Sequence, residues 1–330
     1  MTTTIQSEAA GGVRRQESFG LPAGSSLTPL LNIAFCIDEN YGRCTGVLIT
    51  SIVMNNPGLP LSFHIFTRSI LPEDRKRIAE LSNLYPISIH IYYIDVEAVQ
   101  NLPAANHYSA AIYYRFLMPP ILQGTVDRVL YLDSDIICLG NLSELASWDM
   151  GGAAVAAVED VPRVAAEKKQ ELQLRHGHYC NSGVLLIDVN RWNEANLSAQ
   201  MMNILAESNG KYSLFDQDAL NLVLDGQVSL LPPIWNQVYD LGQMTHDPLP
   251  GTVFLHYTGG VKPWRLSGRH RLSAHYHKYE AASPWAGSPF LPPANYKEME
   301  IYARLSFKAG DLLTALRWYG RYLRAKLRNH

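Results

Sequence analysis

The sequence predicts an α/β fold in which a mostly parallel central sheet is flanked by helices. The first observation is an alternation near the N-terminus, where apolar strands at 30–37, 61–66 and 87–94 are separated by two helical segments. Successive strand, helix and strand units of this kind build parallel sheets. The second observation is an apolar run, 129–132, that ends abruptly in two aspartates. It indicates a buried strand that opens at its C-terminal end into a site, where α/β sheets bind their ligands.

The early elements have local signals at their ends. The first helix passes through residues 46–54 and is stopped by the Asn-Asn-Pro-Gly sequence at 55–58. The second helix begins near Pro72 and carries Ile and Leu residues at helical spacing. Residues 1–28 are rich in Thr, Ser, Gly and Ala, and we expect them to form a disordered extension.

Composition excludes several classes of protein. The chain has 330 residues, of which 47% are hydrophobic and 18% charged, which is typical of a globular protein with a sizeable core. A net charge of −2 gives no signature of nucleic-acid binding. The four cysteines show neither a Cys-x-x-Cys pair nor a zinc spacing, so we expect buried free thiols in a reducing compartment. Without an apolar run long enough to cross a bilayer or a signal-peptide core, the sequence favours an intracellular protein.

Asp133 and Asp135 follow the 129–132 strand and lie two residues apart. Where a strand ends, both carboxylates can turn toward one point, and they repel each other unless a cation lies between them. Oxygen ligands of this kind suit Mg²⁺ or Mn²⁺. A strand followed by an Asp-Ser-Asp turn without a metal explains the pattern equally well.

A second candidate segment follows the apolar strand that ends in His256. Gly259 and Gly260 allow close approach of the backbone to a ligand, and Lys262 supplies a positive charge suited to phosphate. Histidine can be the third ligand to a divalent ion held by two aspartates. A histidine after a strand is more often a core residue, but the Gly-Gly-x-Lys that follows favours a ligand.

The corner after the first strand contains Asp38, Asn40 and Tyr41. The Asp and Asn side chains can hydrogen-bond the edge of a base, and the Tyr ring can stack on it. A plain strand-to-helix connection with an Asp or Asn cap is the alternative. The sequence has neither a G-x-G-x-x-G nor a G-x-x-x-x-G-K-[ST] motif, which argues against a dinucleotide site or a phosphate loop.

Two further segments, a short helix and the start of a strand, carry polar residues that are candidates for ligand binding. Arg115 lies on a short helix at 107–116, where it can pair with a phosphate or an aspartate, or be a surface cation. The strand at 179–188 begins with Asn181 and Gly183. The Asn amide can bind a sugar hydroxyl, and the glycine allows close approach of a ligand or backbone. A β-bulge before a core strand is the alternative.

A helix begins at the sequence Ser-Leu-Phe-Asp-Gln-Asp. Ser213 is a candidate N-cap, with Asp216 three residues later in a variant of the capping box. Acidic residues are stabilising in a first helical turn, so a purely structural explanation suffices for both aspartates. Gln217 and Asp218 stay free for another role if this turn faces the aspartates of the 129–132 strand.

Together these segments resemble the retaining family 8 glycosyltransferases, whose GT-A fold has a Rossmann-like central sheet. The match covers roughly residues 30–270 in the same order, and it is most similar to bacterial glucosyl- and galactosyltransferases of the lipopolysaccharide or lipooligosaccharide core. It rests on a D-x-N-Y corner, an Arg-bearing helix, a D-x-D strand, an N-[SA]-G strand, a D-Q-D helix start and an H-Y-x-G-x-x-K-P-W segment.

The resemblance implies a set of ligands and roles. Mn²⁺, with Mg²⁺ as an alternative, would bridge the diphosphate of a UDP-hexose, and its ligands would be Asp133, Asp135 and His256. The phosphates would also contact Gly259, Gly260 and Lys262. Uracil would be bound by Asp38, Asn40 and Tyr41, and the donor sugar by Arg115, Asn181 and Asp216. The resemblance leaves glucose and galactose both open as the donor sugar.

The resemblance also implies retention of anomeric configuration. A double displacement needs a nucleophile on the far face of the sugar, where the family has the Gln of D-Q-D, here Gln217. An amide is a poor nucleophile, so we expect front-face attack through a short-lived ion pair. Gln217 and Asp218 would stabilise the positive charge, and Asp216 completes the expected catalytic group.

The division expected along the chain is a GT-A catalytic domain over 29–270 and a helical, basic segment over 271–330. In the latter, leucines and aromatics recur at helical spacing among Arg and Lys residues from 312 to 328. Such a helix can lie on an anionic bilayer, as the resemblance supports, or pack on the catalytic domain with a solvated basic face. We therefore expect a peripheral protein on the inner face of the cytoplasmic membrane, acting on a lipid-linked oligosaccharide.

Two rival classes share parts of the pattern. A haloacid-dehalogenase-like phosphatase also has an apolar strand ending in D-x-D, but it needs Thr where this chain has Ile137. A non-catalytic sugar-nucleotide-binding relative would keep the D-x-N-Y corner and lose the metal ligands, whereas all three expected ligand positions are filled here.

Overall fold

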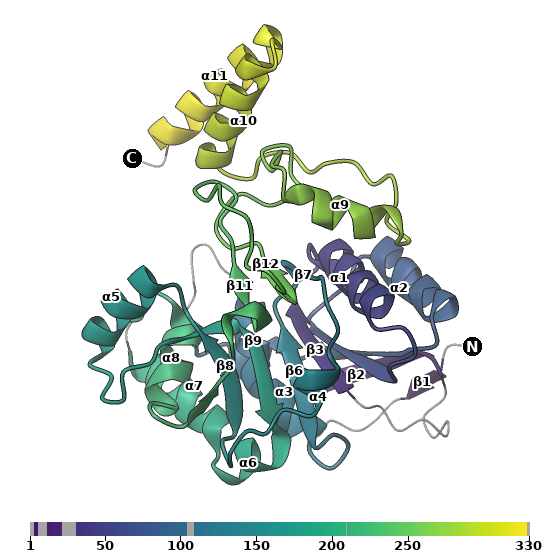
Figure 1. Ribbon diagram of the computed structural model, residues 1–330, viewed down its shortest axis with the longest axis vertical. Helices are drawn as coiled ribbons and strands as arrows, with labels where there is room; N and C mark the ends of the chain where they lie inside the picture. The colour runs from purple at the N-terminus through teal and green to yellow at the C-terminus, as the bar shows by residue number, and fades with distance from the viewer. Residues whose placement is uncertain (1–2, 6–11, 22–30, 104–108, 209, 329–330) are drawn as a thin grey trace.

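The computed structural model describes residues 3–5, 12–21, 31–103, 109–208 and 210–328 (Figure 1). Its main feature is a nine-stranded sheet in the order β1-β2-β5-β4-β3-β6-β9-β8-β10. The strands of this sheet are β1 (Thr3–Ile5), β2 (Val13–Gly20), β3 (Leu31–Ile37), β4 (Leu61–Thr67), β5 (Ser88–Ile94), β6 (Arg128–Leu132), β8 (Val155–Glu159), β9 (Cys180–Asp188) and β10 (Val228–Leu230).

The α/β class is confirmed, and the sheet is mixed. The central block β5-β4-β3-β6 is parallel, as the alternation of strands and helices predicts. β9 runs antiparallel to both β6 and β8. This reversal places the start of β9 beside the end of β6, so the polar residues at these two strand ends meet.

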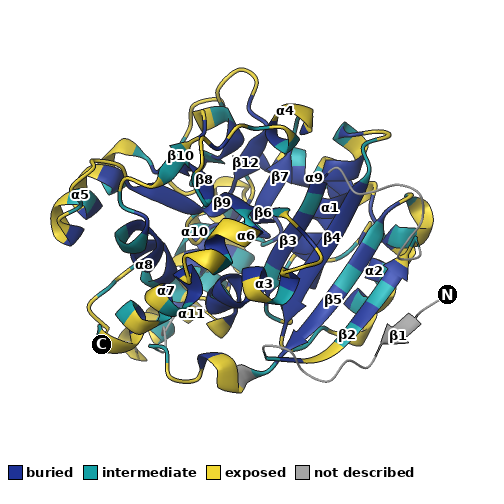
Figure 2. Ribbon diagram, turned by 90° about the horizontal axis from the view of Figure 1, so that it is seen from below, coloured by how far each residue is buried: buried dark blue, intermediate teal, exposed yellow. Residues whose placement is uncertain are grey.

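Helices cover both faces of the sheet (Figure 1). One face packs against α1 (Gly42–Asn55) and α2 (Pro72–Leu84). The other face packs against α3 (Tyr114–Leu122), α6 (Val189–Glu194), α7 (Leu197–Glu207) and α8 (Phe215–Val223). Alternate residues of β3 belong to the two cores, as the period of a strand requires. Figure 2 shows the result, with buried strands inside and exposed residues on the outer helical surfaces.

A smaller sheet stands beside the carboxyl ends of the central strands. It consists of β7 (Ile136–Cys138), β12 (Phe254–His256) and β11 (Gln237–Val238). β12 pairs antiparallel with β7, and His256 lies opposite Ile136. The remaining short elements are α4 (Ser143–Ala146), α5 (Pro162–Leu172) and the 3₁₀ turns η1 (Val96–Val99), η2 (Ala110–Tyr113) and η3 (Pro233–Trp235).

The prediction of a disordered extension over 1–28 is wrong for Val13–Gly20, which form β2 against β5. Glu17 is fully buried and pairs with Arg75 of α2 at 2.7 Å, and the guanidinium of Arg75 also lies over the ring of Phe19. A strand anchored by a buried carboxylate lacks the apolar run that marks a strand in the sequence. Residues 1–2, 6–11 and 22–28 of the predicted extension lie outside the described residues.

The last part of the chain is helical. α9 (Ser273–Ala281) packs against α1, and Arg43 of α1 donates to Glu280 at 2.8 Å. α10 (Tyr296–Lys308) and α11 (Leu312–Arg328) form a hairpin that stands away from the large sheet (Figure 1). α11 buries Ala315 and Tyr322, whereas most of its leucines are exposed. Within the described residues, no helix is long and apolar enough to cross a membrane.

Candidate functional site

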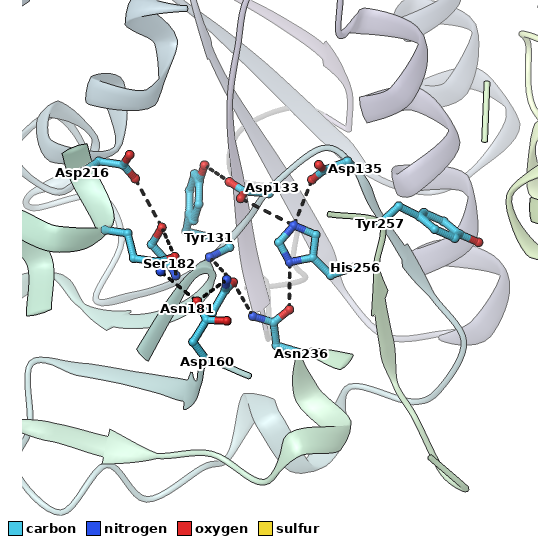
Figure 3. A network of polar contacts seen from close by, with 12 residues as sticks. Tyr131, Asp133, Asp135, Asp160, Asn181, Ser182, Asp216, Asn236, His256 and Tyr257 are labelled. Atoms are coloured by element: carbon cyan, nitrogen blue, oxygen red, sulfur yellow. Dashed lines mark hydrogen bonds and ion pairs between the residues drawn. The ribbon is translucent and has the colours of Figure 1, made fainter. Parts of the chain in front are cut away.

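Three side chains from distant parts of the sequence converge where β6 ends (Figure 3). The Nε2 atom of His256 lies 3.2 Å from Oδ1 of Asp135 and 3.8 Å from Oδ2 of Asp133. One ligand atom from each residue lies within 4.8 Å of the others. Backbone hydrogen bonds hold this arrangement, since the Asp133 N–H donates to Gly183 and the Tyr257 N–H donates to the carbonyl of Asp135.

The chemistry of this cluster fits a divalent cation. Two carboxylates and an imidazole are ligands that suit Mn²⁺, and carboxylates also suit Mg²⁺. The histidine side chain is 4% exposed, and those of Asp135 and Asp133 are 16% and 27% exposed, so the cluster is open on the carboxylate side. Burial by itself would raise the pKa of Asp135, but the charges of Lys262 and His256 outweigh it and hold that pKa well below its usual range.

Gly183 leaves the space that this cluster needs. A Cβ at this position would lie 2.4 Å from Cε1 of His256 and 2.9 Å from Oδ2 of Asp133. The group that approaches Gly183 is the imidazole side chain of the cluster, whereas the sequence led us to expect a ligand or backbone. No side chain larger than hydrogen fits without moving the imidazole.

Arg115 is buried, so the surface-cation alternative is wrong. Its guanidinium donates to Asp216 at 2.8 Å and to Asp133 at 3.2 Å, and it lies over the ring of Tyr131. It also donates to the carbonyl and the hydroxyl of Ser182. Burial raises the pKa of Asp216 to about 6, against the opposing effect of the Arg115 charge. This arginine therefore joins the start of α8 to the metal-ligand strand.

The start of α8 differs from the predicted capping box. Ser213 does not cap the helix: its hydroxyl accepts a hydrogen bond from Lys168. Asp218 accepts the Leu214 N–H at 3.0 Å, pairs with Lys168 at 2.9 Å and accepts the hydroxyl of Tyr179. The Asp218 side chain is 0% exposed, and its carboxylate holds the first turn of α8. Its expected part in stabilising positive charge on the sugar stays a prediction.

Gln217 and Asn181 lie in a buried amide network with two residues that the sequence did not single out. Figure 3 labels Asn181 and these two residues, Asp160 and Asn236. Asp160 accepts hydrogen bonds from both amides, and Asn236 lies between Asn181 and His256. A possible sequence signal for Asp160 was its place directly after an apolar strand, as for Asp133. The short segment before β11 gives no comparable signal for Asn236.

The positive and glycine-rich segment after His256 also reaches the cluster. Lys262 donates to Oδ2 of Asp135 at 2.6 Å and to the carbonyl of Tyr257. Gly259 adopts a φ of +74°, and a Cβ there would lie 2.8 Å from Asp240. Gly260 has open space on its Cβ side.

The corner between β3 and α1 faces the same segment. Asp38 accepts the backbone N–H of Asn40 at 2.8 Å, and no side chain caps α1. The alternative of an Asp or Asn helix cap is therefore wrong. The ring of Tyr41 lies edge-on to Trp264, with 6.1 Å between centroids.

Comparison with known proteins agrees with this geometry. The glycosyl transferase family 8 model matches residues 32–268, and the model of the family 8 C-terminal region matches residues 272–326. The chain belongs to glycosyl transferase family 8. Family 8 membership rules out the phosphatase alternative.

Two curated relatives and one solved structure match most of this chain. It is 30% identical over 307 residues to the lipopolysaccharide 1,3-galactosyltransferase of Salmonella typhimurium, covering 90% of this chain and 91% of the relative. It is 33% identical over 275 residues to the lipopolysaccharide 1,2-glucosyltransferase of Escherichia coli, covering 80% and 81%. The solved structure of the galactosyltransferase LgtC with donor and acceptor sugar analogs superposes with a TM-score of 0.68 at 22% identity, covering 77% of this chain and 96% of that one. This likeness shows the GT-A fold.

Proposed function

We propose that this family 8 enzyme is a retaining hexosyltransferase that moves glucose or galactose from a UDP-sugar to an oligosaccharide of the lipopolysaccharide core type. The observation that carries the proposal is the cluster of Asp133, Asp135 and His256, with Lys262 beside it, at the C-terminal end of a central strand. The relatives that act on lipopolysaccharide support the acceptor class.

The cluster would hold Mn²⁺, which neutralises the charge that develops on a departing diphosphate. Lys262 would add a positive charge on the same side when its bond to Asp135 is exchanged for one to a phosphate. Gly259 and Gly260 would bring backbone close to the diphosphate. Asp38, Asn40 and Tyr41 would bind uracil at the neighbouring corner.

The sugar would be held on the opposite side of the cluster. Arg115 and Asp216 form one ion pair there, and Asn181 directly precedes Ser182, which hydrogen-bonds both of them. A carboxylate paired with a buried guanidinium is well placed to accept hydrogen bonds from sugar hydroxyls and to favour positive charge on the ring. Asp218 would act by fixing the first turn of α8 and not by touching the sugar.

Retention would follow from front-face attack. The Oε1 atom of Gln217 already accepts the Ser182 N–H at 3.0 Å, and its Nε2 donates to Asp160 at 2.8 Å. An amide held by both ends is a weak nucleophile, which favours a short-lived ion pair over a covalent intermediate. The departing phosphate would take the proton of the acceptor hydroxyl.

The α10–α11 hairpin would attach the enzyme to the inner face of the cytoplasmic membrane. Its exposed apolar residues are Phe307, Leu312, Leu313, Leu316, Tyr319, Leu323 and Leu327. Arginines flank them, and none of Arg317, Arg321, Arg324 and Arg328 has an acidic partner among the ion pairs of the described residues. Apolar residues beside unpaired positive charge suit an anionic lipid surface.

A donor screen tests the proposal. UDP release is measured with UDP-glucose, UDP-galactose and their N-acetyl forms, with and without Mn²⁺, using a deacylated core oligosaccharide as acceptor. We expect turnover with one of the two unsubstituted hexoses, dependence on Mn²⁺, and a product whose anomeric configuration matches that of the donor. Nucleotide binding without turnover on any core acceptor would favour the non-catalytic alternative.

A further inference from the structure

Behind His256 lies a chain of buried polar side chains, Asp160–Asn181–Asn236–His256, called the amide chain below (Figure 3). Nδ2 of Asn181 donates to Oδ2 of Asp160 at 3.2 Å. Nδ2 of Asn236 donates to Oδ1 of Asn181 at 2.8 Å. Oδ1 of Asn236 lies 3.0 Å from Nδ1 of His256. Every member is at most 8% exposed, so water does not compete strongly for these bonds.

The direction of the amide chain follows from partners that have a single hydrogen-bonding role. An amide can turn end for end, but an ionised carboxylate only accepts and a backbone N–H only donates. Asp160 therefore requires the NH₂ group of Asn181. The N–H of Gly183, 3.0 Å from Oδ1 of Asn181, independently requires the oxygen at that position. Asn236 must then donate to Asn181 and turn its carbonyl oxygen toward His256.

This direction determines which nitrogen of His256 carries hydrogen. A carbonyl oxygen facing Nδ1 requires a hydrogen on Nδ1. Nε2 lies 3.2 Å from the carboxylate of Asp135 and gives up any hydrogen that it shares with that carboxylate when a cation binds, so it is the atom that supplies the lone pair. Histidine ligands to metals are held in this way by a carboxylate or carbonyl on the other ring nitrogen, and loss of that partner costs 10–100-fold in affinity.

We propose that Asp160 is a positioning residue that, together with the N–H of Gly183, orients Asn181 and Asn236 so that Nδ1 of His256 keeps a hydrogen and Nε2 binds a divalent cation. The inference rests on the proposed function in one respect, namely that the cation belongs to the transferase site. The same carboxylate accepts Nε2 of Gln217 at 2.8 Å, so one buried charge orients residues on both sides of the site.

The test begins with Asp160→Asn, which keeps the shape of the side chain and removes its charge. An amide at 160 can present either end to Asn181, so only the N–H of Gly183 still opposes reversal of the amide chain. The full-length protein is labelled with ¹⁵N-histidine, freed of metal with a chelator and studied by NMR in alkaline buffer, with His256→Gln used for assignment. We expect hydrogen on Nδ1 in the unchanged protein, whether or not Nε2 also carries one toward Asp135, and a fraction of molecules without it in Asp160→Asn. Mn²⁺ affinity, measured by electron paramagnetic resonance, should fall about 10–100-fold.

A second change separates positioning from general damage to the fold. In Asp160→Asn/Asn236→Asp, a carboxylate beside His256 accepts the Nδ1 hydrogen directly, so the hydrogen on Nδ1 and most of the Mn²⁺ affinity should return. Asn236→Leu removes the acceptor while leaving Asp160 in place, and it should leave a fraction of molecules without that hydrogen even if Asp160→Asn fails to fold. Asp225→Asn is the matched control, because Asp225 accepts two backbone N–H groups and lies outside the amide chain.

The results distinguish this inference from the proposed function. Hydrogen on Nε2 alone in the unchanged protein would overturn it, as would unaltered hydrogen on Nδ1 in both Asp160→Asn and Asn236→Leu. If the unchanged protein shows hydrogen on Nδ1 but does not bind Mn²⁺, the assignment of the tautomer holds and the metal site of the proposed transferase fails.

Discussion

Replacing Gly183 by Ala should disable the metal cluster while leaving its three ligands in the sequence. The new Cβ would lie 2.4 Å from Cε1 of His256, and non-bonded carbon atoms prefer about 3.5–4.0 Å. The imidazole, or the strand that carries Gly183, must therefore move by about 1 Å. Ligand distances in a metal site tolerate only about 0.2 Å, so the cluster cannot keep all three ligands.

The expected effects of Gly183→Ala follow from that displacement. Mn²⁺ affinity, measured by calorimetry, and kcat/KM for the UDP-hexose should each fall about 100-fold or more. Because an overpacked core costs about 1–3 kcal/mol, the metal-free variant should remain folded with a lower Tm. Gly320→Ala is the matched control, because a Cβ there meets nothing within 4 Å. Mn²⁺ affinity and kcat/KM equal to those of the unchanged enzyme would refute the reasoning.

Three further predictions concern the ligand set, the ion pair and the hairpin. Asp135→Asn should reduce Mn²⁺-dependent turnover at least about 1,000-fold with a normal circular dichroism spectrum, since it removes a ligand and the partner of Lys262; normal turnover would contradict the metal assignment. Because the pKa of Asp216 is raised to about 6, the folded metal-free protein binds a proton there more tightly than the unfolded chain does. Its unfolding free energy should therefore fall by about 2 kcal/mol as the pH rises from about 4 to about 6. Denaturant titrations across this pH range should show a smaller fall in unfolding free energy for Asp216→Asn than for the unchanged protein. Identical pH profiles for the two proteins would be evidence against the raised pKa of Asp216. Removal of residues 310–330 should abolish sedimentation with anionic vesicles but spare turnover on a soluble acceptor, and continued sedimentation would rule out the hairpin as the attachment site.

The local periodicity of the sequence predicted much of the central fold. The strands expected at 30–37, 61–66 and 87–94 correspond to β3, β4 and β5, and the helix expected near Pro72 begins at that residue. These elements are recognisable because their burial repeats along the chain at the period of the element. β2 was missed because its anchor is a buried carboxylate whose partner, Arg75, lies on a different element.

The start of α8 shows why cap assignments fail more easily. Ser213 and Asp216 have the spacing of a capping box, but Lys168 takes the serine hydroxyl and Arg115 takes the aspartate. Asp218 then takes over part of the capping by accepting the Leu214 N–H. A buried cation from another helix offers a stronger interaction than a neutral backbone N–H, and it comes from residues that no local window contains.

The sequence by itself determined which chemical groups stand at the ends of buried strands: two carboxylates after β6, an amide and a glycine at the start of β9, and a histidine at the end of β12. Only the tertiary structure decided that they meet, through the antiparallel pairing of β9 with β6 and of β12 with β7. It also decided that Asp160 and Asn236 stand behind them. Strand order and register arise from the simultaneous burial of many side chains across the whole sheet. The direction of a hydrogen bond between two distant side chains has no trace in the residues next to either one.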